Sequence, residues 1–159
     1  VEMAASNEGK MEALRIKTIA DHGYTDGAAN PSKHPAGMFS ICTGSYDIKT
    51  AFTEMDAYYT NKPPGGVAYR CSFRVTEAVH AIERVVDVLA KKLDRDPAEL
   101  RLQNFIQPDE FPYKSALGWE YDSGDYPRAL KLAMDKIGYE DLRKEQKEKN
   151  CEKIPQNEV

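Results

Sequence analysis

Apolar and polar positions follow two different periods along this chain. Residues 14–18, Leu-Arg-Ile-Lys-Thr, alternate strictly, which predicts a strand with one buried face and one solvated face. A second extended stretch, residues 3–6, precedes it, and the Asn-Glu-Gly-Lys sequence at 7–10 between them is typical of a hairpin turn. We therefore expect an antiparallel hairpin at the edge of a sheet.

The second period, of three to four residues, begins after residue 74 and predicts an amphipathic helix over about residues 76–93. Asp96-Pro97-Ala98-Glu99 is typical of a helix start, followed by a short helix to about Asn104. Another amphipathic helix is expected from near Asp125 to Gly138, and the alternating charges beyond it predict a solvated helix. The positions that define the apolar face of the first helix are Val75, Val79, Ile82, Val86, Leu89 and Leu93.

Glycine and proline separate the two regions. The stretch from Gly23 to Gly44 predicts an irregular or briefly helical segment, and residues 47–59 form a third extended segment. The Pro-Pro-Gly-Gly sequence at 63–66 ends that segment, because proline cannot continue a hydrogen-bonded ladder. We predict an α+β fold, with antiparallel strands and an irregular segment in residues 1–60, a loop at 61–75 and mainly helices at 76–150.

Composition narrows the class of protein. Apolar residues make up 41% and charged residues 30%, as in ordinary globular proteins, and no apolar run reaches the length of a membrane span. With 22 basic against 26 acidic residues and no basic stripe, a nucleic-acid partner is excluded. Three distant cysteines fit neither a disulfide framework nor a zinc site, so we expect a cytoplasmic location, which leaves open an association with the inner face of the cytoplasmic membrane. The chain begins with Val1 in what reads as a strand, so we expect a single internal fragment, residues 1–159, of a larger subunit.

Cys71 is the candidate for chemistry. It lies between Arg70 and Arg74, just ahead of the first predicted helix, and both the guanidinium groups and the positive end of the helix dipole favour a thiolate. A lone thiolate cannot complete a zinc tetrahedron but suits a soft, low-coordinate ion such as Cu(I). Gly66, ahead of it, would let the backbone approach a bulky cofactor. The alternative, that Cys71 only fills the core, stays open, and for Cys42 a packing role is the expectation.

Residues 68–74, Ala-Tyr-Arg-Cys-Ser-Phe-Arg, resemble the active-site signature of the large subunit of form I aerobic carbon monoxide dehydrogenases, within the xanthine oxidase family of molybdenum hydroxylases. Copper-free members of that family carry glycine at the position of Cys71. The resemblance covers nearly the whole chain. It continues through residues 31–33, 41–47, 75–78, 81–84, 104–108 and 118–124.

The resemblance implies that Cys71 holds a copper ion bridged through sulfide to molybdenum on molybdopterin cytosine dinucleotide. Arg70, Ser72 and Phe73 would line the catalytic site together with Cys71. The residues implied to bind the cofactor are Gly66, Tyr69, Arg70, Cys71 and Ser72. The implied reaction oxidises CO with water to CO2. Its electrons would pass to an iron–sulfur small subunit and a FAD-containing medium subunit, in a dimer of heterotrimers.

Two other functions stay open. A molybdenum hydroxylase for another substrate would favour glycine at position 71, which this chain lacks. A non-catalytic structural or subunit-interface fragment would use Cys71 for packing and its helices for contacts with partners. The family's catalytic glutamate falls outside these 159 residues, and Glu77 is better explained as a first-turn helix residue. We therefore expect the isolated chain to be inactive.

Overall fold

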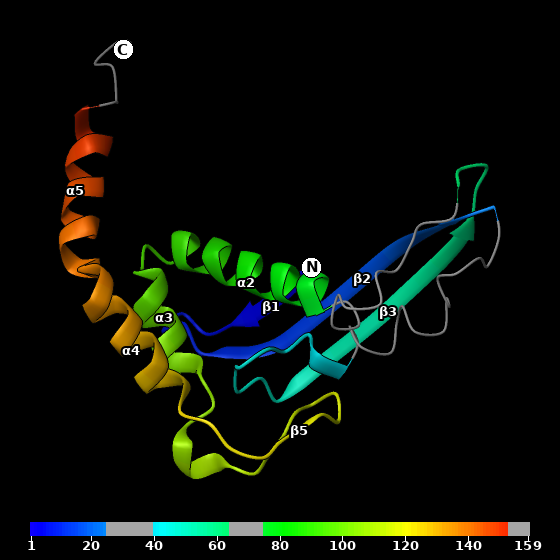
Figure 1. Ribbon diagram of the computed structural model, residues 1–159, viewed down its shortest axis with the longest axis horizontal. Coiled ribbons are helices and arrows are strands. Elements are labelled where there is room, and N and C mark those ends of the chain that lie inside the picture. The colour runs from blue at the N-terminus through cyan, green and yellow to red at the C-terminus, as the bar shows by residue number, and fades with distance from the viewer. Residues whose placement is uncertain (25–39, 64–74, 153–159) are drawn as a thin grey trace.

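The computed structural model describes residues 1–24, 40–63 and 75–152 and shows an α+β fold, as predicted (Figure 1). The elements are β1 (Glu2–Ala5), β2 (Met11–Gly23), β3 (Thr50–Tyr59), α2 (Val75–Lys92), α3 (Pro97–Asn104), the 3-10 helix η2 (Pro108–Glu110), β4 (Tyr113–Lys114), β5 (Glu120–Tyr121), α4 (Tyr126–Ile137) and α5 (Tyr139–Glu152). In the described ranges, no helix has the length and apolar character needed to cross a membrane.

The first two strands form the predicted hairpin. β1 pairs antiparallel with β2, with Glu2 opposite Arg15 and Ala4 opposite Ala13. The turn between them closes through the Ser6 amide, which donates to the Lys10 carbonyl at 2.9 Å, and Gly9 adopts a φ of 84°. Leu14 and Ile16 are buried while Arg15 is exposed, so the alternation identified the correct face of β2.

The position of β2 in the sheet differs from the prediction. The strand order is β1-β2-β3, so β2 is the central strand and not an edge. β3 pairs parallel to it, from Ala13 opposite Thr50 to Gly23 opposite Tyr59, and the prediction of purely antiparallel strands is wrong here. Alternation reports which face of a strand is buried but not which strands lie beside it. The long connection between β2 and β3 gives the chain enough length to return and run in the same direction.

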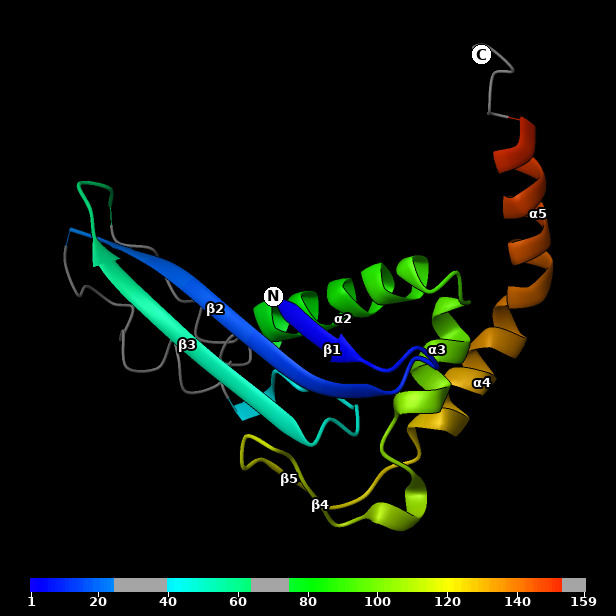
Figure 2. The same cartoon turned by 180° about the vertical axis from the view of Figure 1, so that it is seen from behind.

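α2 crosses one face of the sheet, as the two opposite views show (Figures 1 and 2). Its buried residues are Ala78, Ile82, Val86 and Ala90, which pack with Leu14 and Ile16 of β2 in one core cluster. The predicted face was rotated from this one, because Val79 is 47% exposed. The predicted face was defined by the large apolar residues alone. The buried face also includes alanines, whose small side chains let a helix pack closely on a sheet.

The ends of the helices follow the predicted signals. The Asp96 side chain accepts hydrogen bonds from the amides of Ala98 and Glu99 at the start of α3. At α4, Asp125 accepts from the Arg128 amide, and Gly138 ends the helix with a left-handed φ of 63°. α4 and α5 extend away from the sheet beyond α3 (Figure 1), and α4 contains no fully buried residue.

Candidate cofactor-binding site

All six predicted site residues fall in the 64–74 segment, outside the described residues. They are Gly66, Tyr69, Arg70, Cys71, Ser72 and Phe73. The structure therefore describes the elements on either side of this segment, which we call its frame. One end of the frame is the tip of β2 and β3, and the other is the first turn of α2.

The strand tip holds the chain that enters the segment. The Tyr24 amide donates to the Lys62 carbonyl at 3.0 Å, and the Thr60 amide donates to the Gly23 carbonyl at 2.9 Å. The Asp21 carboxylate lies 2.9 Å from the Lys62 ammonium and accepts from the Thr60 hydroxyl at 2.6 Å. The pKa of Asp21 is lowered by these hydrogen bonds, first by that from Lys62 and then by those from Thr60 and the Gly23 amide. Several local contacts thus fix the path of the backbone up to Pro63.

Residues 42–46 lie in the core beneath α2. Cys42 is fully buried, and burial raises the pKa of its thiol to about 11, so the predicted packing role of this cysteine is confirmed. Gly44 adopts a φ of 59°, and a Cβ added there would lie 3.4 Å from the side chain of Ile82. Thr43 is also buried, and its hydroxyl has no hydrogen-bond partner in the part of the chain that the structure describes.

A polar cluster joins α2, α3 and this core segment. The hydroxyl of the buried Tyr46 donates to the Glu83 carboxylate at 2.9 Å. Arg101 of α3 lies 2.7 Å from the same carboxylate and 2.9 Å from that of Asp87. Burial, and then the Glu83 carboxylate, raise the pKa of Tyr46, so its hydroxyl keeps the proton that it donates. We call these four residues, Tyr46, Glu83, Asp87 and Arg101, the Arg101 cluster.

Two further buried polar residues tie the hairpin to the helices. The Asn104 side chain accepts from the Met11 amide at 2.8 Å and donates to the Gly9 carbonyl at 2.9 Å. Asp47 pairs with Lys10 at 3.1 Å and accepts from the Tyr113 hydroxyl at 2.9 Å. Sequence reasoning missed these residues and the Arg101 cluster. Asn and Asp are usually exposed, so only contacts between distant segments reveal their burial.

Several aromatic residues from the chain after α3 pack against residues 44–46. The ring of Phe105 stacks on that of Tyr46 at a centroid distance of 5.3 Å, and the Tyr121 hydroxyl donates to the Gly44 carbonyl at 2.9 Å. The ring of Tyr121 in β5 contacts that of Tyr113 in β4, and Phe111 contacts Tyr126 of α4. The chain from residue 105 to 126 therefore supports residues 44–46.

The described residues contain no preformed metal site. In the ranges 1–24, 40–63 and 75–152, no group of three or more His, Cys, Asp or Glu side chains could hold a metal ion. A copper ion would therefore depend on the segment around Cys71. The buried hydroxyl of Thr43, with a hydrogen bond still to make, fits a polar group contributed by a cofactor or by another part of a larger subunit.

Comparison with known proteins decides the family. The molybdopterin cofactor-binding domain matches residues 1–105. The chain belongs to this family. Its β1–β2–β3 sheet and α2 lie wholly inside the matched range, and so does the Cys71 segment, whereas α4 and α5 lie beyond it.

Among the molybdopterin-binding proteins, two carbon monoxide dehydrogenase large chains are similar to this chain. The protein from Afipia carboxidovorans strain OM5 is 60% identical over 93% of the chain, and that from Hydrogenophaga pseudoflava is 57% identical over 91%. The nicotine 6-hydroxylase large subunit of Paenarthrobacter nicotinovorans is 29% identical over 87% of the chain and 17% of its own length. The chain spans only 18% of the length of each carbon monoxide dehydrogenase relative.

A solved structure shows the same relationship. The Cu,Mo-CO dehydrogenase in its carbon monoxide reduced state superposes with a TM-score of 0.87 at 59% identity, covering 93% of this chain and 19% of that one. The predicted resemblance to carbon monoxide dehydrogenase large subunits is thus confirmed. The roles assigned to the six residues of the 64–74 segment stay predictions.

Proposed function

We propose that this chain is part of the catalytic large subunit of an aerobic carbon monoxide dehydrogenase. The observation that carries the proposal is the difference in identity within one family: 60% to a carbon monoxide dehydrogenase large chain against 29% to a nicotine hydroxylase subunit, over nearly the same stretch of sequence. Molybdenum hydroxylases for other substrates share the fold. They share far less of the sequence that surrounds the Cys71 segment.

The centre that we propose contains copper and molybdenum: the Cys71 thiolate would hold the copper ion, and molybdopterin cytosine dinucleotide would carry the molybdenum. When bound, this group would supply a soft Cu(I) site for CO and a two-electron acceptor, for the reaction CO + H2O to CO2 with two protons and two electrons. Arg70, Ser72 and Phe73 would line the site, with Phe73 as an apolar wall suited to a small uncharged gas. Gly66 and Tyr69 would shape the approach of the backbone to the cofactor.

The described residues would serve this centre by holding both ends of its loop. The Asp21–Lys62 ion pair and the backbone hydrogen bonds at the strand tip fix one end. At the other end, the buried face of α2 packs the helix against the sheet. A reacting group that is held in place before substrate arrives avoids an entropic cost during the reaction. This frame is the contribution of the chain's described part to the proposed activity.

The electrons would leave through companion subunits, an iron–sulfur small subunit and a FAD-containing medium subunit, in a dimer of heterotrimers. We place the enzyme in the cytoplasm, with an association with the inner membrane face as a further proposal. Because the chain spans 18% of its relatives' length, other parts of the cofactor site would come from the rest of the subunit. The isolated chain is expected to show no CO oxidation.

The test uses the complete large subunit in its complex, with Cys71→Ala as the variant and Cys42→Ala as the matched control. Both changes remove one thiol, but Cys42 lies in the core. We expect Cys71→Ala to lose copper and CO oxidation while it keeps molybdenum, and Cys42→Ala to keep both metals. Copper and turnover that persist in Cys71→Ala would refute the copper assignment.

The same experiment separates the alternatives. A complex that contains molybdenum, lacks copper and hydroxylates an N-heterocycle would be a hydroxylase for another substrate. A complex in which the Cys71 thiol resists alkylation and neither metal content nor turnover depends on it would support a packing role for this residue.

A further inference from the structure

The further inference concerns Arg101 and rests on the proposed function. α2 begins at Val75, directly after the 64–74 segment, so any tilt or rotation of this helix moves the anchor of the Cys71 loop. The helix lies on the sheet through Ala78, Ile82, Val86 and Ala90. Burial of such apolar groups is favourable but non-directional, and it does not by itself set the angle of the helix.

The Arg101 cluster supplies the directional contacts. Arg101 binds two carboxylates spaced four residues apart on α2, at 2.7 Å to Glu83 and 2.9 Å to Asp87. Residues at this spacing lie on one face of a helix, and a planar guanidinium with five fixed donors can bind both at once. This face of α2 therefore has one favoured orientation toward α3.

Both sides of the cluster are themselves held. The guanidinium donates to the Pro97 carbonyl at 3.0 Å, which ties it to the first turn of its own helix, and its side chain is 17% exposed. On the other side, Tyr46 binds the same Glu83 carboxylate and is fixed by the stacked ring of Phe105. Two separate segments, residue 46 and α3, thus meet at one carboxylate of α2.

If α2 tilts about the Arg101 cluster, the start of the helix, where the Cys71 loop is attached, is displaced. Glu83 lies eight residues after Val75, which places it about 12 Å from the helix start at about 1.5 Å per residue. A tilt of about 5° at that point would shift the helix start by about 1 Å, and a misplacement of that size can lower a catalytic rate about a hundredfold. Small changes at Arg101 are therefore amplified at the loop.

We propose that Arg101 is a positioning residue, which sets the orientation of α2 through Glu83 and Asp87 and thereby the placement of the Cys71 loop. The contacts of Arg101 described above are all with protein groups. Its effect on the reaction passes through the helix.

The test compares Arg101→Met with Arg143→Met in the intact complex, with Arg101→Lys as a second variant. Arg143 is a matched control, because it makes a partly buried ion pair of 3.0 Å with Asp96 but belongs to α5 and pairs with Asp96 and Gln146 rather than with the α2 carboxylates. The measurements are the copper-to-molybdenum ratio, hydrogen exchange of the α2 amides of residues 79–82, and the melting temperature.

For Arg101→Met we expect exchange at residues 79–82 to rise at least tenfold and the copper-to-molybdenum ratio to fall at least twofold, with molybdenum retained. Arg101→Lys should recover part of both effects, since an ammonium can bind one carboxylate, and it replaces the Met variant if that one does not assemble. Arg143→Met should leave both quantities unchanged even if its melting temperature falls equally.

Unchanged exchange and copper content in Arg101→Met, with only a lower melting temperature, would overturn the proposal and leave Arg101 as a stabilising residue. The exchange measurement does not depend on CO or copper. If the unmodified complex proved to lack copper and CO oxidation, the proposed function would fail, while the contrast in exchange between the two arginine variants would still decide whether Arg101 orients α2.

Discussion

The hydroxyl of Tyr139 lies 3.1 Å from the carboxylate of Asp96, the same group that caps the start of α3. Arg143 of α5 adds an ion pair to this carboxylate at 3.0 Å. One side chain thus starts one helix and attaches another. Because none of residues 139–149 of α5 is fully buried, the attachment of α5 relies on this polar contact more than on apolar burial.

The first prediction concerns the pH dependence of that attachment. Partial burial opposes ionisation of Asp96, but the amides of Glu99 and Ala98, with Tyr139 and Arg143, outweigh it and lower the pKa of the carboxyl group. A lowered pKa in the folded protein stabilises it above the unfolded pKa of about 3.9, and this contribution is lost as pH falls through the folded value. Hydrogen exchange of α5, corrected for intrinsic rates, should show protection that begins to fall below about pH 4 and is lost as the pH passes the lowered pKa of Asp96. In Asp96→Asn the protection should be weaker at neutral pH and nearly independent of pH, and an unchanged profile would contradict the assignment.

A second prediction tests the buried amide of Asn104. Asn104→Leu keeps the branched shape and the number of side-chain heavy atoms but leaves the Met11 amide and the Gly9 carbonyl without their partners in a buried position. Burying such groups unpaired costs about 1–3 kcal/mol each, so we expect the free energy of local unfolding of α3 to fall by about 2–4 kcal/mol. Native-state hydrogen exchange of the α3 amides in the complete subunit measures this quantity. A loss below about 0.5 kcal/mol would mean that these groups find other partners.

The third prediction compares two glycines that share a backbone conformation. Gly9 and Gly118 have φ values of 84° and 85°, but a Cβ at Gly9 would lie 2.6 Å from Arg95 and 2.8 Å from Leu100, whereas Gly118 has open space. Alanine at Gly118 should cost only the left-handed conformation, about 1–2 kcal/mol. Gly9→Ala should cost about 1–2 kcal/mol more, because Leu100 is fully buried and Arg95 is bound to the Glu8 carbonyl. Hydrogen exchange of the β1–β2 hairpin and of the residues around Gly118 measures the loss of local stability in each variant. Equal losses would show that the hairpin turn relaxes freely.

A fourth prediction separates the two cysteines by reactivity. With a thiol pKa of about 11, Cys42 would be only about 0.1% thiolate at pH 8, and it is fully buried. Iodoacetamide should therefore leave Cys42 unmodified in the native, copper-free subunit and label it only after unfolding. Cys71, flanked by arginines in the sequence, should react at least a hundredfold faster. Mass spectrometry of the labelled peptides gives both rates, and comparable rates would contradict the proposed thiolate at Cys71.

Local signals in the sequence were sufficient for the local parts of the fold. The turn at Gly9, the cap at Asp96 and the stop at Gly138 each depend on residues within a few positions, and the structure has all three. The direction of β3 and the rotation of α2 depend on contacts between distant segments. A pattern read along one segment has no access to such contacts, and both predictions were wrong in detail.

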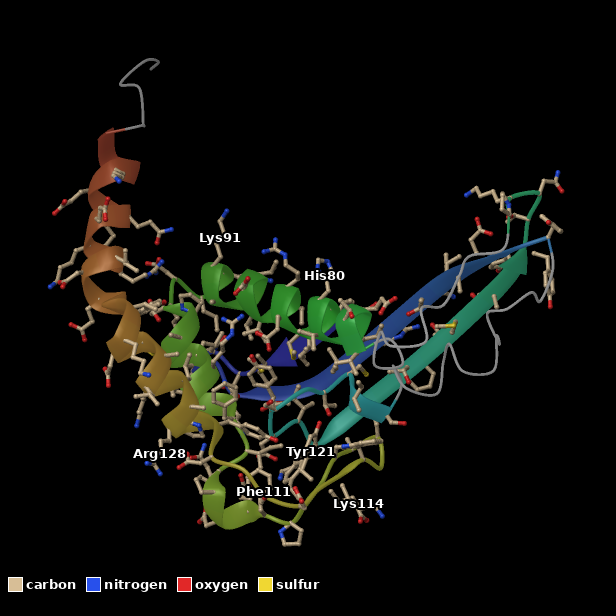
Figure 3. The ribbon with its side chains drawn as sticks, in the orientation of Figure 1. His80, Lys91, Phe111, Lys114, Tyr121 and Arg128 are labelled. Carbon is tan, nitrogen blue, oxygen red and sulfur yellow. The ribbon has the colours of Figure 1, made fainter. Side chains whose placement is uncertain are left out.

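The same distinction between local and long-range signals applies to the candidate site. A short, specific sequence around Cys71 was enough to predict the family, which the comparisons confirm. The Arg101 cluster gave no such signal, because Tyr46, Glu83 and Arg101 lie far apart in the chain and charged residues on helices usually face solvent. On α2 that expectation does hold for His80 and Lys91, whose side chains point away from the sheet (Figure 3).

The parallel pairing of β2 and β3 has a kinetic consequence. Their paired residues lie about 37 positions apart, whereas the β1–β2 hairpin and the α2–α3 contact join near neighbours. Closing the long connection costs chain entropy before the contacts between β2 and β3 have formed to offset that cost. The β1–β2 hairpin can form as soon as its own residues have left the ribosome, whereas β3 can pair with β2 only after the long connection between them has also been made. Insertion of β3 beside β2 is therefore the step at which folding of this domain would be slowest and most open to mispairing.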